Sequence, residues 1–576
     1  MTSTVGGPAR VERPDTDAGA TRHMPAWPVV ALAYVLGSLV LHHRVLPDLA
    51  GTATGAVASD SGLFSWWLEW TWWSTWHGQN PLFTTWMNAP GGVNALWNTT
   101  VPLLGAVLGP VTALAGPVVA FNVGMILGPV VTALVGYAAL RPWVARALPR
   151  AVGGALIGFG PFMAAHLWAA HLNLVWVILP PFLLWAVHAL FVAPRHPWRT
   201  GVVIGVVFAA QTGIYTLMVA LAAIVLVVVA VVLAALWPRE VRGRLPDLAR
   251  SGVACVGVYV VLCAYPLWLL LAGPQRPRGP IRDATEAGAD AANLLVPTSL
   301  TALQGGTGSW ADALRAYPGE QGSYLGPALL VVLVVAVIVG GRTVRIAAGI
   351  TALLALLSLG TSVVVLDRDT GIPLPWALLT DLPLIGQTEA GRLAPFVATG
   401  VALVVALVLD RALAGRRWVV VGAVVLATLT WWPADAQAIS RTAAPPFFTS
   451  GAQALAPGEM VKMWPRTTGV WANGADPLVW QTAAEMRFRQ TGGYFIASDP
   501  ERPVILEGVV DEYDRGASGQ PADPDRARVD LRERGVTAVL VVPRADADPG
   551  LERAWTAAVT RDPGTEDGGV WLFRLR

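Results

Sequence analysis

The sequence predicts a mostly α-helical, polytopic membrane bundle with about eleven spans, followed by a small extracytoplasmic α/β domain. Three observations lead to this fold class. Hydrophobic residues make up 54% of the 576 residues and charged residues only 14%, whereas soluble domains carry about 25% charged residues. Apolar stretches of membrane-spanning length recur along the first three quarters of the chain. After Trp432 the sequence becomes charged and proline-rich, with no further apolar span.

The apolar stretches divide into individual spans after a polar tail, residues 1–25, which is typical of a disordered cytoplasmic segment. The expected spans are Trp27–Leu46, Val118–Leu140, Ala151–Trp168, Leu174–Val192, Gly201–Leu236, Gly252–Ala272, Tyr324–Gly340, Ile346–Leu366, Leu393–Leu409 and Val419–Leu429. Because Gly201–Leu236 is too long for one helix and is interrupted at Gln211–Tyr215, we expect two short helices or a re-entrant pair there.

Arginine-rich loops predict the orientation, because cytoplasmic loops carry an excess of Lys and Arg. If all of these loops are cytoplasmic, the N-terminus lies inside and the C-terminus outside. Residues 96–116 then cannot be a full span, and their prolines favour a re-entrant or interfacial helix pair. The basic clusters lie at 141–150, 195–199, 239–250, 342–345 and 411–417; the membrane domain comprises 26–433, with outer loops 47–117, 274–322 and 367–392, and the outer domain comprises 434–576. We therefore expect a multi-pass plasma-membrane protein whose unusual polar residues gather on the extracytoplasmic face.

The stretch Ser59–Pro90 follows the first span and carries seven tryptophans together with Asp60 and Glu69. Tryptophan favours the membrane–water interface, so we predict an interfacial helix and loop that hold Asp60 just above the bilayer. A carboxylate there can have a raised pKa and act as a general base; the alternative is an exposed loop acid. Asp60 and Glu69 lie about half a turn out of phase on a helix, so they need not share a site.

Two histidines, His166 and His171, lie at the expected outer end of a helical hairpin. They fall about 140° apart on a regular helix, so a shared metal would need a turn between them and a third ligand that the sequence does not identify. The alternatives are hydrogen bonds to a phosphate or sugar, and a pair of interfacial histidines.

Arginines on the outer side indicate an anion site. Arg276, Arg278 and Arg282 run against the positive-inside trend in a long loop, which suggests a lipid phosphate or contact with lipid headgroups. Arg392 opens a span at a helix N-terminus, where an anion is favoured; the alternative is snorkelling to headgroups.

The outer domain has a strand and helix pattern without a glycine-rich phosphate loop, so a nucleotide site is not supported. Asp523 and Pro524 predict a helix start, Gly535 its end, and Val536–Val542 a strand. A second helix at about Gly550–Val559 and a last strand at Val570–Leu575 follow. The run Trp480–Tyr494 suits sugar binding by Trp480 and Gln481 but also an ordinary core, which we favour. A net charge of +2 gives no sign of nucleic acid, and we expect no such partner.

This organisation resembles the GT-C superfamily of membrane glycosyltransferases, and more narrowly the YfhO-like bacterial membrane proteins. The Ala, Val, Arg, Gly and Pro bias suggests a GC-rich genome, as in actinobacteria. The matching stretches are SDSGLFSWWLEW, GQNPLFTTWMNAPGGVN, HLWAAHLNLVWVILP, EQGSYLGPALL, LPLIGQTEAGRLAPF and WQTAAEMRFRQTGGY.

The resemblance implies sugar transfer from a polyprenyl-phosphate donor to a cell-envelope glycan or lipid acceptor, with Asp60 as catalytic base. Many members carry a pair of acids there; here Ser61 follows Asp60, and Glu69 is the nearest second acid. Arg392 would hold the lipid phosphate. The expected substrate-binding residues are His166, His171, Glu320, Gln387, Arg392, Trp480 and Gln481. No cofactor is certain, and a divalent cation such as Mg or Mn is possible.

Two other functions compete with glycosyl transfer. One is a non-catalytic membrane protein that handles envelope polysaccharide or a lipid carrier. A transporter is less favoured, because transporters place charged residues near mid-membrane and these spans are almost free of charge.

Overall fold

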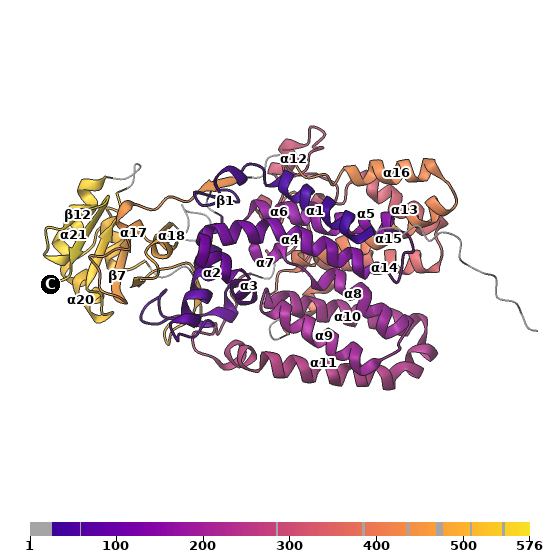
Figure 1. Cartoon of the computed structure of the whole chain (residues 1–576), viewed down its shortest axis with the longest axis horizontal. Helices are drawn as coiled ribbons and strands as arrows, with labels where there is room; N and C mark the ends of the chain where they lie inside the picture. Colours follow the sequence, from indigo (N-terminus) through magenta and orange to yellow (C-terminus); the bar gives the residue numbers. More distant parts are fainter. Residues whose placement is uncertain are drawn as a thin grey trace, which may run out of the picture.

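The computed structural model describes residues 26–576 except 58, 284–285, 383–385, 387, 435–437, 468–475, 507–509 and 544–547. The described part is elongated, with a helical bundle at one end and a sheet domain at the other (Figure 1). Helix α2 (Ser61–Trp76) lies between the two. The expected tail, residues 1–25, lies outside the described residues.

The bundle contains apolar helical stretches long enough to span a membrane and shorter apolar helices. Its helices are α1 (Ala26–Leu41), α2 (Ser61–Trp76), α3 (Pro102–Ala115), α4 (Pro117–Ala139), α5 (Ala147–Phe159), α6 (Pro161–Trp168), α7 (Leu172–Val175), α8 (Leu179–Val187), α9 (Pro197–Thr212), α10 (Thr216–Leu236), α11 (Pro238–Ala272), α12 (Gly308–Asp312), α13 (Pro327–Val339), α14 (Arg342–Ser358), α15 (Ala394–Ala414) and α16 (Trp418–Leu429). Six helical stretches are long and apolar enough to cross a membrane: Pro117–Ala139, Ala147–Trp168, Leu172–Val192, Thr216–Leu236, Pro238–Ala272 and Ala390–Ala414. Four apolar helices, α1, α3, α13 and α16, are shorter. The protein is therefore a membrane protein; the sequence predicts about eleven spans, and six of the described stretches reach full length.

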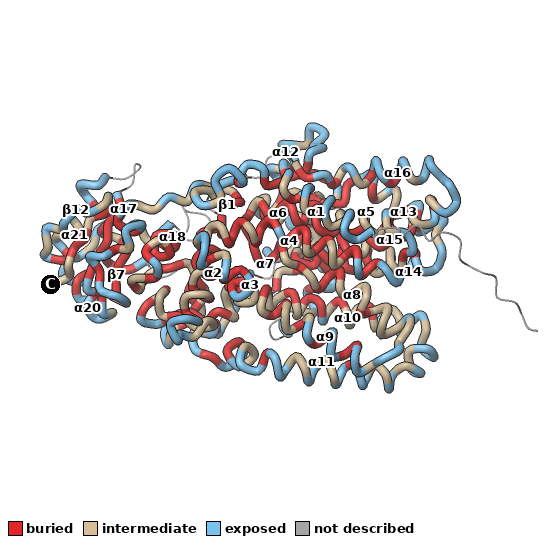
Figure 2. Tube along the Cα trace, viewed as in Figure 1, coloured by how far each residue is buried: buried red, intermediate tan, exposed pale blue. Residues whose placement is uncertain are grey.

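Burial separates a central core from a lipid-facing rim. Helices α4 and α15 are mostly buried in the centre of the bundle, whereas few residues of α11 at its edge are buried (Figure 2). Val253, Val256 and Val260 on α11 are exposed apolar residues. Exposed aliphatic side chains on such a long helix suit contact with lipid tails.

The long apolar stretch at residues 201–236 is split into α9 and α10, as the sequence predicts. Gln211 is fully buried at the break, and its Oε1 accepts hydrogen bonds from the N–H groups of Ile178 (3.2 Å) and Leu179 (3.3 Å). Backbone groups freed by a broken helix need such partners inside a bundle. The same break puts Tyr215 at the N-cap of α10, where it faces the site described below.

Two expectations about the helices are wrong. Residues 96–116 do not form a helix pair: a 3-10 turn, η2 (Ala95–Trp97), precedes one helix, α3, which packs against α2 and α4. The span expected at Ile346–Leu366 ends early, because α14 stops at Ser358 and Gly360 has a positive φ of 90°. The β-branched residues that follow form β4 (Ser362–Val365), paired with β5 (Arg368–Pro373).

The arginine-rich loops gather at the end of the bundle away from the sheet domain (Figure 1). Arg146 forms an ion pair with Asp410 at 3.1 Å, and the Arg342 guanidinium lies 4.1 Å from the centroid of the Trp237 ring. These contacts join chain segments that the charge pattern assigns to one side of the membrane.

The outer domain is a mixed sheet with helices, and its strand order is β12-β13-β11-β7-β8. Strand β7 is parallel to both β8 and β11, and β13 is antiparallel to its neighbours. The elements are β6 (Ile439–Arg441), α17 (Pro446–Thr449), β7 (Glu459–Trp464), α18 (Asp476–Ala483), β8 (Phe488–Gln490), β9 (Ile496–Ala497), β10 (Ile505–Leu506), α19 (Glu512–Ala517), α20 (Pro524–Glu533), β11 (Ala538–Val541), α21 (Pro549–Thr560), β12 (Thr565–Asp567) and β13 (Val570–Arg574). The expected helix start is confirmed, because the Asp523 side chain caps α20. The predicted strand, second helix and last strand are present as β11, α21 and β13.

The tryptophan-rich helix α2 joins the outer domain to the bundle. Trp66, Trp67 and Trp70 are at most 1% exposed and pack with Leu478 and other apolar residues of the outer domain. The Trp66 Nε1–H donates to Gln481 Oε1 at 2.7 Å. The expectation of an interfacial helix therefore needs correction, since these rings are buried by protein.

We expect Trp66→Ala to lower the free energy of unfolding by about 3–5 kcal/mol, because it removes a fully buried ring. Thermal unfolding in detergent, followed by intrinsic fluorescence, measures this effect. Trp76→Ala on the same helix is the matched control, since that ring is 69% exposed. Equal unfolding temperatures for the two variants would contradict a joining role for Trp66.

Candidate active site

Asp60 stands at the N-cap of α2, but its side chain does not cap the helix. Aspartate at this position usually accepts a hydrogen bond from the first helical turn. The preceding loop is fixed to the end of α6, because the N–H groups of Ala56 and Asp60 donate to the backbone oxygens of Trp168 (2.8 Å) and Ala169 (3.4 Å). The carboxyl group instead lines a cavity.

The environment of Asp60 favours proton exchange near neutral pH. Burial raises the pKa of Asp60 to about 7, although Arg392, Arg282 and a hydrogen bond from Tyr494 act in the opposite direction. Its Oδ1 has no hydrogen-bond partner within the described part of the chain. A carboxyl group with this pKa and a free oxygen can accept a proton from a bound hydroxyl group.

The turn required between the two histidines is present. Ala170 adopts a positive φ of 62°, and the His171 N–H donates to the His166 backbone oxygen at 2.9 Å. The two Nδ1 atoms are 2.9 Å apart and share a hydrogen bond. His171 Nε2 lies 3.2 Å from the Tyr317 hydroxyl and 3.5 Å from Asp60 Oδ2. Burial, and to a lesser extent the neighbouring His166, holds the pKa of His171 well below its usual range. The imidazole of His171 is therefore neutral at neutral pH, and its contact with Asp60 is not a salt bridge.

Arg392 lies in the 3-10 turn η8 (Ala390–Leu393) that leads into α15. It is buried rather than snorkelled to the surface, since only 6% of the residue is exposed. Its Nη2 lies 2.6 Å from Glu320 Oε1, and the guanidinium also contacts Glu389 and the Tyr215 hydroxyl. Arg282 forms a second ion pair with Glu389.

These groups surround one cavity of about 520 Å³ between the bundle and the outer domain. The segments that lead into α10 and α15 provide Tyr215 and Arg392, and the outer domain provides Tyr494 and Phe495. The polar lining residues are Asp60, Asn98, Thr99, Thr100, His171, Asn173, Thr212, Tyr215, Thr216, Arg282, Tyr317, Glu389, Arg392 and Tyr494. A second cavity, of about 500 Å³, has a mainly apolar lining and includes Arg244 on α11 and Arg342 at the start of α14. Among these two cavities, only the first combines an unpaired carboxylate oxygen with a buried cation, Arg392.

His166, His171 and Glu320 can hold a metal ion, because one ligand atom from each lies within 4.8 Å of the others. The histidine pair and Glu320 are all expected site residues, and the structure supplies the third ligand that the sequence did not identify. Two imidazole nitrogens and a carboxylate suit Mn²⁺ or Zn²⁺ better than Mg²⁺, which prefers oxygen ligands.

The other expected residues lie elsewhere. Glu69 lies on α2 and does not line the cavity. Burial, and to a lesser extent the charge of Glu485, raises the pKa of Glu69 to about 7. Trp480 and Gln481 are buried in the outer domain, so both are core residues. The Nε2–H group of Gln481 donates a hydrogen bond to the backbone oxygen of Phe488 at 2.7 Å. Gln387 lies outside the described residues.

Sequence reasoning did not single out Tyr317, Glu389 or Asn173, which all line the cavity. Glu389 had a visible signal, since it lies three residues before Arg392, the spacing of side chains that meet on a helical turn. Tyr317 and Asn173 had none, because only the folding of distant loops brings them to Asp60. Both amide atoms of Asn173 are buried without a hydrogen-bond partner in the described structure.

No family model matches the sequence, and no curated protein sequence matches it. Solved structures do match its fold. Arabinofuranosyltransferase AftD from Mycobacteria superposes with a TM-score of 0.57 and 15% identity, over 96% of this chain and 40% of that chain. This chain therefore spans less than half the length of AftD.

Two structures from Archaeoglobus fulgidus are also similar. Its oligosaccharyltransferase in the apo form gives a TM-score of 0.51 and 14% identity, over 94% of this chain and 72% of that chain. The oligosaccharyltransferase AglB in complex with an inhibitory peptide and a dolichol-phosphate gives a TM-score of 0.52 and 13% identity, over 92% of this chain and 70% of that chain. The chain therefore shares its fold with solved membrane glycosyltransferases, an arabinofuranosyltransferase and oligosaccharyltransferases. The GT-C resemblance expected from the sequence is confirmed at the level of the fold.

Proposed function

We propose that this protein transfers a sugar from a polyprenyl-phosphate donor to a cell-envelope glycan or lipid on the extracytoplasmic face of the plasma membrane. One observation carries the proposal: the buried Asp60 carboxyl group, with a pKa of about 7, shares a cavity with Arg392 and Arg282. A base and a phosphate-binding pair of cations are what this displacement requires. The GT-C fold supports the same reaction class.

In this proposal, Asp60 takes the proton of an acceptor hydroxyl group as its oxygen attacks the anomeric carbon of the donor. The bond from that carbon to the phosphate oxygen breaks, and polyprenyl phosphate leaves with the bonding electron pair. Arg392, with Arg282, stabilises the negative charge that grows on the leaving phosphate. Tyr494 positions Asp60 through its hydrogen bond. A single displacement inverts the anomeric configuration.

His166, His171 and Glu320 are proposed to hold a divalent cation, whose charge would assist phosphate binding. The donor set fits such an ion, because one ligand atom from each of two imidazoles and a carboxylate lies within 4.8 Å of the others. The transfer step assigned to Asp60 and Arg392 does not require this cation.

Transfer from labelled donors tests the proposal. The purified protein in nanodiscs is mixed with polyprenyl-phosphate pentoses and hexoses and with an envelope glycan extract. We expect one donor to yield labelled glycan together with free polyprenyl phosphate. Absence of both products from every donor, with a protein that unfolds cooperatively, would favour the non-catalytic lipid-handling role.

The rate of transfer should depend on pH through Asp60. Its raised pKa leaves the carboxyl group protonated, and unable to act as a base, below about pH 7. We expect kcat/KM to fall about tenfold per pH unit below pH 7 and to level off above it. His171 does not add a second step there, because its pKa lies well below this range. A profile measured with Glu69→Gln should keep the same shape, since Glu69 titrates near pH 7 outside the cavity. A flat profile between about pH 5 and about pH 8 would exclude Asp60 as the base.

A further inference from the structure

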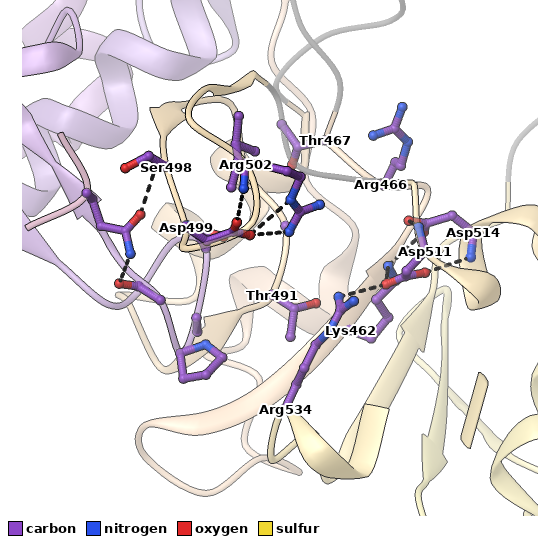
Figure 3. Close-up of a pocket in the computed structure, with 17 residues that line it drawn as sticks. Lys462, Arg466, Thr467, Thr491, Ser498, Asp499, Arg502, Asp511, Asp514 and Arg534 are labelled. Carbon is purple, nitrogen blue, oxygen red and sulfur yellow. Dashed lines mark hydrogen bonds and ion pairs between the residues drawn. The ribbon is translucent and has the colours of Figure 1, made fainter. Parts of the chain in front are cut away.

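A separate polar pocket lies where the outer domain meets the loop after α2 (Figure 3). We call it the sheet-edge pocket; its volume is about 200 Å³. It is lined by Asn88, Ala89, Pro90, Gly91, Gln275, Lys462, Arg466, Thr467, Thr491, Gly492, Ser498, Asp499, Arg502, Ile505, Asp511, Asp514 and Arg534. Neither Asp60 nor Arg392 belongs to this lining.

The pocket lies at the carboxyl ends of parallel strands. Arg466 and Thr467 follow β7, and Thr491 follows its parallel neighbour β8. The chain leaves β7 toward β8 on one side and later returns to β11 on the other side. In open α/β sheets, ligands bind outside the carboxyl ends of strands at such a reversal of strand order.

Most charged groups in the pocket are already paired. Lys462 Nζ lies 2.7 Å from oxygens of both Asp511 and Asp514, and Arg534 contacts Asp511 at 3.0 Å. Arg502 Nε donates to Asp499 at 2.9 Å. Within the described part of the chain, these ion pairs neutralise the charge of the three carboxylates that line the pocket.

Three lining groups have no such partner among the described residues. The hydroxyl groups of Thr467 and Thr491 are buried and make no hydrogen bond among the described residues. These residues are only 1% and 8% exposed, so leaving their hydroxyl groups unpaired is costly. Arg466 is half-buried and has no ion-pair partner in the described structure. A ligand for this pocket must therefore offer a negative charge together with groups that pair with hydroxyls.

We propose that the sheet-edge pocket binds a sugar residue that carries an anionic group, a carboxylate or a phosphate. The ring hydroxyls of such a sugar pair with Thr467 and Thr491, and its anionic group pairs with Arg466. A nucleotide is disfavoured, because the described lining offers no aromatic ring for a base to stack on.

The position of the pocket indicates what such binding does. Thr491 and Gly492 line the sheet-edge pocket, whereas Tyr494 and Phe495 of the same segment line the cavity that holds Asp60. An anionic sugar in the pocket therefore lies one short loop away from the proposed base. Its role as part of the acceptor rests on the proposed function, whereas its binding does not.

Isothermal titration of the full chain in nanodiscs, without any donor, tests the binding. The probes are glucuronate, glucose 6-phosphate, glucose and inorganic phosphate. We expect saturable binding of the two anionic sugars and at least about tenfold weaker binding of glucose and of phosphate. Binding of phosphate as tight as that of the sugars would reduce the pocket to an anion site, and equal binding of glucose would exclude the role of the charge. No saturable binding of either anionic sugar would overturn the proposal.

Variants locate the binding within the pocket. Arg466→Ala should weaken glucuronate binding by about tenfold or more, and Thr491→Val, which keeps the side-chain shape, by about three- to tenfold. Arg532→Ala is the matched control, because Arg532 is exposed on α20 and outside the pocket. Binding unchanged in both pocket variants would place the sugar elsewhere and contradict the proposal. Because no transfer step is measured, the result does not depend on whether the chain is a glycosyltransferase.

Discussion

Asp60→Asn is expected to lower the rate of sugar transfer by about 10²- to 10⁴-fold, the usual contribution of a general base. Asparagine keeps the size and most contacts of the side chain but cannot accept a proton from an acceptor hydroxyl group. The change removes no helix cap, because the Asp60 side chain does not cap α2. Initial rates with a labelled donor measure the loss, and the pH dependence below pH 7 should disappear with it.

Glu69→Gln is the matched control for this variant. Glu69 lies on the same helix, and burial likewise raises its pKa to about 7, but it does not line the cavity. Its substitution should leave transfer within about threefold of the parent rate, as is usual away from reacting groups. If Glu69→Gln were the inactive variant and Asp60→Asn the active one, the assignment of the base would be wrong.

Arg392→Lys is expected to lower transfer by about 10²- to 10³-fold, as the loss of one preorganised donor does in other active sites. The guanidinium group of Arg392 contacts Tyr215, Glu320 and Glu389 at once. A lysine ammonium group keeps the charge but not the planar fork that binds a phosphate through two hydrogen bonds. The charge on the leaving phosphate grows in the transition state, so kcat should fall more than KM for the donor rises.

Retaining a positive charge also limits structural damage, because Glu320 and Glu389 keep a cation nearby. Arg315→Lys is the control, since Arg315 belongs to the same outer loops and pairs at 3.0 Å with the exposed Asp367. Unfolding temperatures should be similar for the two variants, while activity differs. A normal kcat in Arg392→Lys would exclude this residue from phosphate stabilisation.

Local patterns in the sequence account for much of the fold. Apolar length located the apolar parts of the six long spans, but α11 begins at Pro238, so residues 239–250, expected in a loop, lie inside that helix. The polar break around Gln211 located the boundary of α9 and α10. Capping chemistry at Asp523 located α20 in the outer domain. Each of these features depends on residues close together in the chain, which is why sequence reasoning reached them.

Features that depend on tertiary contacts were missed. The tryptophans of α2 predicted a helix at the lipid interface, and this prediction was wrong. Leu478 and Gln481 contact the Trp66 ring and help to bury it, and a sequence does not show such contacts between distant residues. Asp60, His171 and Arg392 were expected on one face, but their convergence on a single cavity depends on three loops far apart in sequence. The pairing of Arg392 with Glu320 likewise joins residues 72 positions apart.

In the proposed reaction, the cavity that Asp60 and Arg392 line receives the lipid phosphate. The most direct measurement is a cryo-EM map of the protein in nanodiscs with a bound polyprenyl phosphate. We predict phosphate density within hydrogen-bonding distance of Arg392 or Arg282, with Asp60 facing the same cavity. Phosphate density beside Arg244 and Arg342, in the apolar cavity of about 500 Å³, would contradict the claim.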